Sequence, residues 1–115
     1  MSPESFEPAA EDLFIRVIQI ADNAGATDEH RALNYVAIRY PAIYEEAARA
    51  LAANSALSSI RAKLSRLSGT RRIIDVILSF RSRQTDVEES FFVRVDVQEE
   101  WPFLVTRLSP YYERT

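Results

Sequence analysis

The sequence predicts an α+β fold in which N-terminal helices pack on one face of a three- to four-stranded antiparallel β-meander. Two observations support this prediction. Up to Asn54, apolar residues recur every three or four positions, which is the period of a helix. After Asn54 they alternate with polar residues, which is the period of a strand. The 115 residues are enough for one core, and we expect a flexible leader at 1–9 and a single domain at 10–115.

The first segment of this domain has the helix period but also some features of a strand. The leader before it is polar and contains two prolines, so we expect it to be loose. Residues 13–20 alternate in part, which leaves a strand, even a swapped one, open as an alternative. Gly25, a natural residue just past a helix end, favours the helix. The apolar positions that define it are Leu13, Phe14, Val17, Ile18 and Ala21.

The stretch from Thr27 to Tyr44 predicts two consecutive helices. Thr27 is a good N-cap, because its hydroxyl can accept from a free backbone N–H one turn later. Pro41 has no N–H to continue a helix, so the first helix should end near Tyr40. A second helix should begin with Pro41 and end near Asn54. The apolar stripe of the first helix consists of Leu33, Val36, Ala37 and Tyr40.

The second half of the chain predicts strands that pair in sequence order. We expect them at residues 60–64, 73–81 and 91–97, with a short fourth strand at 104–108. Residues 61–83 carry seven basic side chains and one acidic one, whereas residues 86–100 carry six acidic and one basic. Such segments could pair as neighbouring strands, because opposite charges face each other across the ladder.

The strand pattern also predicts a solvent-facing side of the sheet that is cationic and partly apolar. Three large apolar residues on a wet face suggest a partner or a second copy of the chain, so we expect a homodimer. A cationic sheet surface would steer an acidic peptide. The partner-binding residues that we predict are Arg61, Lys63, Ile73, Ile77, Arg81, Phe92 and Arg94.

The residues that could carry chemistry do not form a recognisable active site. His30 is the only histidine, and no Ser or Cys nucleophile is tied to it, so a solvent-facing helix residue is the favoured interpretation. Asp28, Glu29 and His30 are adjacent and point in different directions, which makes a poor metal site, although a metal bridging two copies stays open. We predict no catalytic residues, no bound metal and no cofactor.

Composition excludes several classes of protein. There is no cysteine, and therefore no disulfide framework or thiolate metal site. No run of 18 apolar residues is present and the N-terminus lacks the pattern of a signal peptide, so we expect a cytoplasmic protein with no membrane partner. The sequence pI near 5.2 argues against nucleic acid as a partner.

Three aromatic residues near the C-terminus have two interpretations. Trp101, Tyr111 and Tyr112 follow the third and fourth strands. We favour a role as lids over the core. The alternative is that they form an aromatic anchor for a partner.

A family resemblance rests on residues 27–35, TDEHRALNY. This segment resembles the T-x-x-x-RALN-(F/Y) opening of the C-terminal domain of the cyanobactin maturation proteases PatA and PatG. The order of the strand segments after it is similar too, and the resemblance covers roughly residues 10–112. We expect the motif residues to be structural: Arg31, Ala32, Leu33, Asn34 and Tyr35. The strand matches comprise Ile60, then Asp75, Val76, Leu78 and Phe80, then Phe92, Val93, Val95, Asp96 and Val97, and a closing Pro110 and Tyr111.

The resemblance implies a place in a ribosomally synthesised and post-translationally modified peptide (RiPP) pathway. The family domain has no established catalytic role and is attached to proteases that cut and cyclise precursor peptides. This chain starts at Met1 without a protease domain, so we expect a free-standing, non-catalytic accessory subunit. Its partner would be a tailoring enzyme, such as a radical-SAM splicease, or the precursor peptide. The rival hypothesis is a small-ligand binder or enzyme with a helix–sheet pocket near Arg31 and Asn34.

Overall fold

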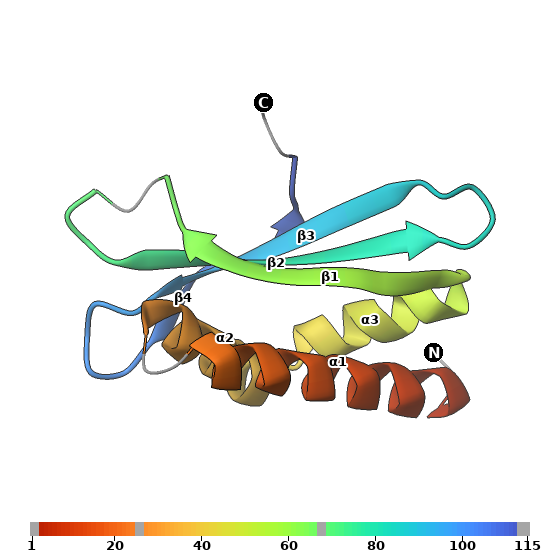
Figure 1. Cartoon of the computed structure of the whole chain (residues 1–115), viewed down its shortest axis with the longest axis horizontal. Helices are drawn as coiled ribbons and strands as arrows, with labels where there is room; N and C mark the ends of the chain where they lie inside the picture. The colour runs from red at the N-terminus through yellow and green to blue at the C-terminus, as the bar shows by residue number, and fades with distance from the viewer. Residues whose placement is uncertain (1–2, 25–26, 67–68, 113–115) are drawn as a thin grey trace.

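The computed structural model describes residues 3–24, 27–66 and 69–112, and within them it has the predicted α+β architecture. Figure 1 shows the helices lying together against one face of the sheet. The helices are α1 (Pro3–Ala24), α2 (Asp28–Arg39) and α3 (Ala42–Ala52). The strands are β1 (Ser55–Leu64), β2 (Ile73–Ser82), β3 (Glu88–Asp96) and β4 (Phe103–Pro110).

Helix α1 begins earlier than the sequence suggests. It starts at Pro3, so residues 3–9, which we expected to be loose, are helical. Leu13 and Val17 are buried in the core, and the strand alternative for residues 13–20 is wrong. Gly25, which was expected to follow the helix end, lies outside the described residues. None of the helices in the described part of the chain is long and apolar enough to cross a membrane.

Helices α2 and α3 follow the predicted pattern. The Thr27 hydroxyl accepts a 3.2 Å hydrogen bond from the backbone N–H of His30, as an N-cap does. Pro41 separates the two helices, and the Tyr44 hydroxyl donates to the main-chain carbonyl of Ala37 across the junction. The α2 stripe that packs into the core consists of Ala32, Leu33, Val36 and Ala37.

The four strands form an antiparallel meander in the order β1-β2-β3-β4, so the fourth strand that we left open is present. One face of the sheet packs against the helices and makes the core. Each large aliphatic side chain buried there contributes about 1.5–3 kcal/mol. The sheet residues of this face that are buried are Ile60, Ile74, Val76, Leu78, Phe80, Val93 and Val95.

The basic and acidic segments pair across β2 and β3, as their charges predict. Arg81 of the basic segment contacts Glu88 of the acidic segment at 2.7 Å. Arg94 also donates through Nε to Asp75 at 2.8 Å, which joins the one base of the acidic segment to the one acid of the basic segment. Arg71, just before β2, donates to Asp96 at the end of β3. This hydrogen bond is the main reason that the pKa of Asp96 lies below its usual value.

Candidate functional site

The predicted apolar cluster on the outer face of the sheet is not exposed. Ile77 is fully buried and Ile73 is 9% exposed. In the strand register Ile77 lies between Arg61 on β1 and Phe92 on β3. Cross-strand neighbours lie about 5 Å apart, so long side chains on both sides can cover an isoleucine between them. The expectation of a wet apolar cluster is therefore wrong.

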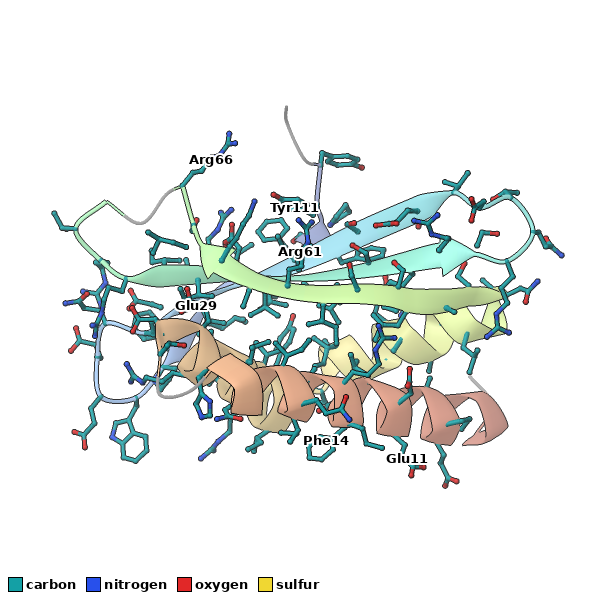
Figure 2. All side chains as sticks on the ribbon, in the orientation of Figure 1. Glu11, Phe14, Glu29, Arg61, Arg66 and Tyr111 are labelled. Atoms are coloured by element: carbon teal, nitrogen blue, oxygen red, sulfur yellow. The ribbon has the colours of Figure 1, made fainter. Side chains whose placement is uncertain are left out.

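Tyr111 helps to cover this face. Its ring packs edge-on against Phe92 with ring centroids 5.7 Å apart, and its backbone N–H donates to Ser90 at 2.8 Å. Lys63 donates through Nζ to the Tyr111 hydroxyl at 2.8 Å. Figure 2 shows Tyr111 and Arg61 together on the side of the sheet away from the helices. Tyr111 therefore covers the outer face of the sheet and not the helix–sheet core over which a lid was predicted, whereas Tyr112 is 83% exposed and is no lid.

The cations predicted on this face are largely engaged within the chain. Arg94 pairs with Asp75 and lies over the Phe92 ring at 4.7 Å. Arg81 pairs with Glu88 and Asp86, whose hydrogen bonds raise the pKa of its guanidinium. An acidic peptide would have to compete with these carboxylates. Most of the predicted cations therefore already have contacts within the chain, and the binding role of this face and the homodimer stay predictions.

A different surface exposes large apolar side chains. An open hollow of about 780 Å³ lies between α2 and the β3–β4 loop, and we call it the Trp101 hollow. Trp101 is 76% exposed and Ile38 is 68% exposed, so two large apolar side chains of one hollow face solvent. The lid interpretation of Trp101 is therefore wrong. The lining residues are His30, Arg31, Asn34, Tyr35, Ile38, Arg39, Glu100, Trp101 and Pro102.

Arg31 fixes the shape of the Trp101 hollow. Its guanidinium donates to the main-chain carbonyl of Val97 and to those of Glu99 at 2.6 Å and Glu100 at 2.9 Å. Hydrogen bonds from a charged donor are stronger than neutral ones. Arg31 thus ties α2 to the β3–β4 loop, and Trp101 directly follows the tied residues.

The other motif residues divide between the core and the hollow. Ala32 and Leu33 are fully buried. Tyr35 packs against the core and also lines the hollow. The Asn34 side-chain nitrogen lies 2.7 Å from Nε2 of His30, one turn earlier on α2. The motif therefore packs a helix and positions one wall of the hollow.

Several polar side chains of the hollow are already engaged within the chain. Arg31 is held by main-chain carbonyls, and His30 and Asn34 bond to each other. Among the described residues, no group of three or more His, Cys, Asp or Glu side chains could hold a metal ion. The hollow offers aromatic and apolar surface bordered by polar groups.

Comparisons with known proteins identify the family. The family model described as PatG C-terminal matches residues 1–111. A solved structure titled "PatG Domain of Unknown Function" superposes with a TM-score of 0.76 at 22% sequence identity, which shows a shared fold. The match covers 95% of this chain but only 43% of that one. No curated protein matches the sequence. The chain belongs to the PatG C-terminal family.

Proposed function

We propose that this PatG C-terminal domain is a non-catalytic binding module of a RiPP pathway. It docks a peptide-modifying enzyme, such as a radical-SAM splicease, or that enzyme's precursor peptide. The family membership supports the pathway, and the Trp101 hollow supports the binding role. The observation that carries the proposal is the 76% exposed Trp101 beside the 68% exposed Ile38.

The hollow has the composition of a binding hot spot. A tryptophan can bury about 150–250 Å² and is enriched among the residues that dominate interface energies. Ile38 and Pro102 extend the apolar surface, while Arg39 and Glu100 border it with opposite charges. An apolar centre with a polar rim is the usual arrangement of a specific interface.

The wall of the hollow is preorganised for binding. Three main-chain carbonyls of the β3–β4 loop accept from Arg31, so the loop is held before a partner arrives. A preordered surface loses less conformational entropy on binding than a loose one. This fits docking of a partner protein or peptide.

Isothermal titration calorimetry tests the proposal. The purified domain is titrated with a candidate peptide-modifying enzyme from the same organism and, separately, with that enzyme's precursor peptide. Trp101→Ala should weaken binding of the true partner by about 2 kcal/mol or more, which is roughly thirtyfold. Phe14→Ala is the matched control, because Phe14 is 44% exposed and points away from the sheet on α1 (Figure 2). Equal affinities for wild type and Trp101→Ala would refute the role of the hollow.

A small molecule is the second candidate for the same hollow. The volume of about 780 Å³ falls in the range of ligand pockets, and Asn34 and Arg39 contribute polar groups to it. An Asn34→Ala variant that stays folded but loses affinity for a small molecule would favour this candidate over protein docking.

A further inference from the structure

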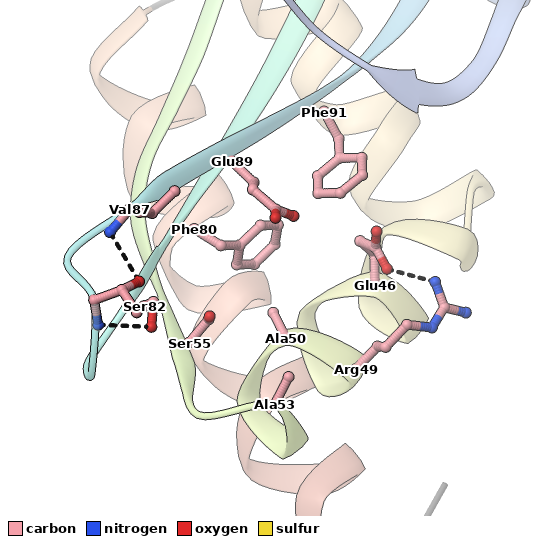
Figure 3. A pocket seen from close by; sticks show the side chains of 11 residues that line it. Glu46, Arg49, Ala50, Ala53, Ser55, Phe80, Ser82, Val87, Glu89 and Phe91 are labelled. Carbon is pink, nitrogen blue, oxygen red and sulfur yellow. Dashed lines mark hydrogen bonds and ion pairs between the residues drawn. The ribbon is translucent and has the colours of Figure 1, made fainter.

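A second groove lies at the other end of the molecule from the Trp101 hollow. It sits between the C-terminal half of α3 and the β2–β3 hairpin, as Figure 3 shows, and has a volume of about 480 Å³. In Figure 1 the β2–β3 hairpin and the β3–β4 loop lie at opposite ends of the sheet. We call it the Glu89 groove.

The floor of the Glu89 groove is aromatic. Phe80 and Phe91 pack edge to face with ring centroids 6.1 Å apart. Both lie on the helix side of the sheet beside the end of α3. Phe80 is 4% exposed, whereas Phe91 is half-buried and presents ring surface to the groove. The faces of aromatic rings attract cations, most strongly where water is partly excluded.

Glu89 is an exposed residue near the start of β3, on the side of the sheet that faces the helices. It pairs with Phe80 in the strand register and shares the helix-facing side of β3 with Phe91. Figure 3 shows its carboxylate directed over the Phe80 ring. No hydrogen bond or ion pair of this carboxylate occurs within the described residues. Glu88 next to it pairs with Arg81, so the two neighbouring carboxylates differ in what they can bind.

The opposite wall adds negative charge. The Glu46 side chain on α3 is 11% exposed and accepts from Arg49 at 2.5 Å. Arg49 is 67% exposed, so its guanidinium extends into solvent. The C-terminal end of α3, which also lines the groove at Ala50 and Ala53, carries the negative end of the helix dipole. The groove therefore carries net negative charge, because the carboxylates of Glu89 and Glu46 and the negative end of α3 together exceed the one positive charge of Arg49.

The rim of the groove is ordered by its own hydrogen bonds. In the hairpin, Ser82 donates its N–H to Val87 at 2.9 Å and Asp86 donates to Ser82 at 3.0 Å. Arg83 donates to the main chain of Asn54 at 3.0 Å, which ties the hairpin to the start of β1. The rim of the groove is therefore held in place by contacts within the chain.

We propose that the Glu89 groove binds a basic side chain, arginine or lysine, of a peptide partner. The carboxylate of Glu89 would pair with the cation, and the alkyl stem would lie on the half-buried ring of Phe91. An organic cation fits better than a metal ion, because no set of three metal-ligating side chains meets among the residues that the structure describes. The groove shares no lining residue with the Trp101 hollow, so this inference does not rest on the proposed function.

NMR titration tests the proposal with N-acetyl-arginine amide and its neutral isostere, N-acetyl-citrulline amide. The arginine derivative should shift the backbone amides of residues 50, 80, 89 and 91, and the citrulline derivative should not. Glu89→Gln should weaken the arginine derivative about fivefold, as loss of a partly exposed ion pair does. Raised salt should weaken it as well.

Glu88→Gln is the control, because it removes the neighbouring charge on the other face. It should leave the affinity for the arginine derivative unchanged. Equal shifts with both derivatives, no shifts at all, or unchanged affinity in a folded Glu89→Gln protein would overturn the proposal. The amide spectrum of each variant reports its folding in the same experiment.

Discussion

Arg31 of helix α2 donates a hydrogen bond to the main-chain carbonyl of Val97, where strand β3 has just ended. The two residues are 66 positions apart in the sequence. This bond, with those to Glu99 and Glu100, makes the motif arginine the clamp of the β3–β4 loop. It explains how a helix motif determines the shape of a surface formed by a distant loop.

Loss of this clamp should loosen the loop and cost stability. We expect Arg31→Met, which keeps an apolar stem, to lower the free energy of unfolding by about 1.5–3 kcal/mol, the usual value of hydrogen bonds from a charged group. Hydrogen exchange at residues 98–101 should accelerate. Arg39→Met, which alters an exposed arginine of the same hollow, should leave both quantities near wild type. A stable Arg31→Met protein with unchanged exchange would contradict the clamp.

Ile77 should act as a core residue and not as an interface residue. Ile77→Asp buries a charge without a partner and should prevent folding or cost about 3 kcal/mol or more. Ile77→Val should cost only about 0.5–1.5 kcal/mol. Chemical denaturation of both variants measures this. If Ile77→Asp unfolds at the wild-type denaturant concentration, the side chain is not buried.

Removing only one member of the Asp75–Arg94 pair should lower the free energy of unfolding substantially. Both side chains are mostly buried, at 6% and 19% exposed. Arg94→Met leaves the Asp75 carboxylate without its partner and should cost about 3–5 kcal/mol. The double variant Asp75→Asn with Arg94→Met should recover part of that loss in a double-mutant cycle. Additive losses in the cycle would mean that the two groups do not interact.

Asp96 should contribute to the acid sensitivity of the fold. Its pKa is lowered mainly by the hydrogen bond from Arg71, so the folded chain binds fewer protons there than the unfolded chain. The stabilisation is fully present above the ordinary aspartate pKa of about 3.9 and disappears as the pH falls through the lower folded value. Asp96→Asn should therefore be less stable than wild type at pH 6, and the difference should shrink below pH 4. Unfolding curves of both proteins across this pH range test the prediction. A difference in unfolding free energy that stays constant with pH would contradict it.

Local sequence patterns were enough for most of the fold. The change of apolar spacing after Asn54 separates helices from strands, and Pro41 marks the break between α2 and α3. Alternation along β2 correctly divides its residues between two faces. These features depend on neighbours in the chain, and they can be read without knowing the tertiary structure.

The candidate site could not be read in the same way. Alternation places Ile77 on the outer face but does not reveal that Tyr111 and its neighbours cover that face. The exposure of Trp101 depends on where Arg31 holds the β3–β4 loop, which no local pattern reveals. Both facts follow from contacts between residues far apart in the sequence. The one sequence signal for an exposed Trp101 was its position directly after two glutamates in a predicted loop.

The most direct test of the binding role uses Trp101, the only tryptophan in the chain. Protein labelled with 5-fluorotryptophan gives one ¹⁹F signal from the Trp101 hollow. Titration with the unlabelled modifying enzyme or the precursor peptide should shift or broaden this signal saturably, and Ile38→Ser should weaken the effect. If calorimetry detects binding while the ¹⁹F signal stays unchanged, the partner docks elsewhere and the hollow is not the site.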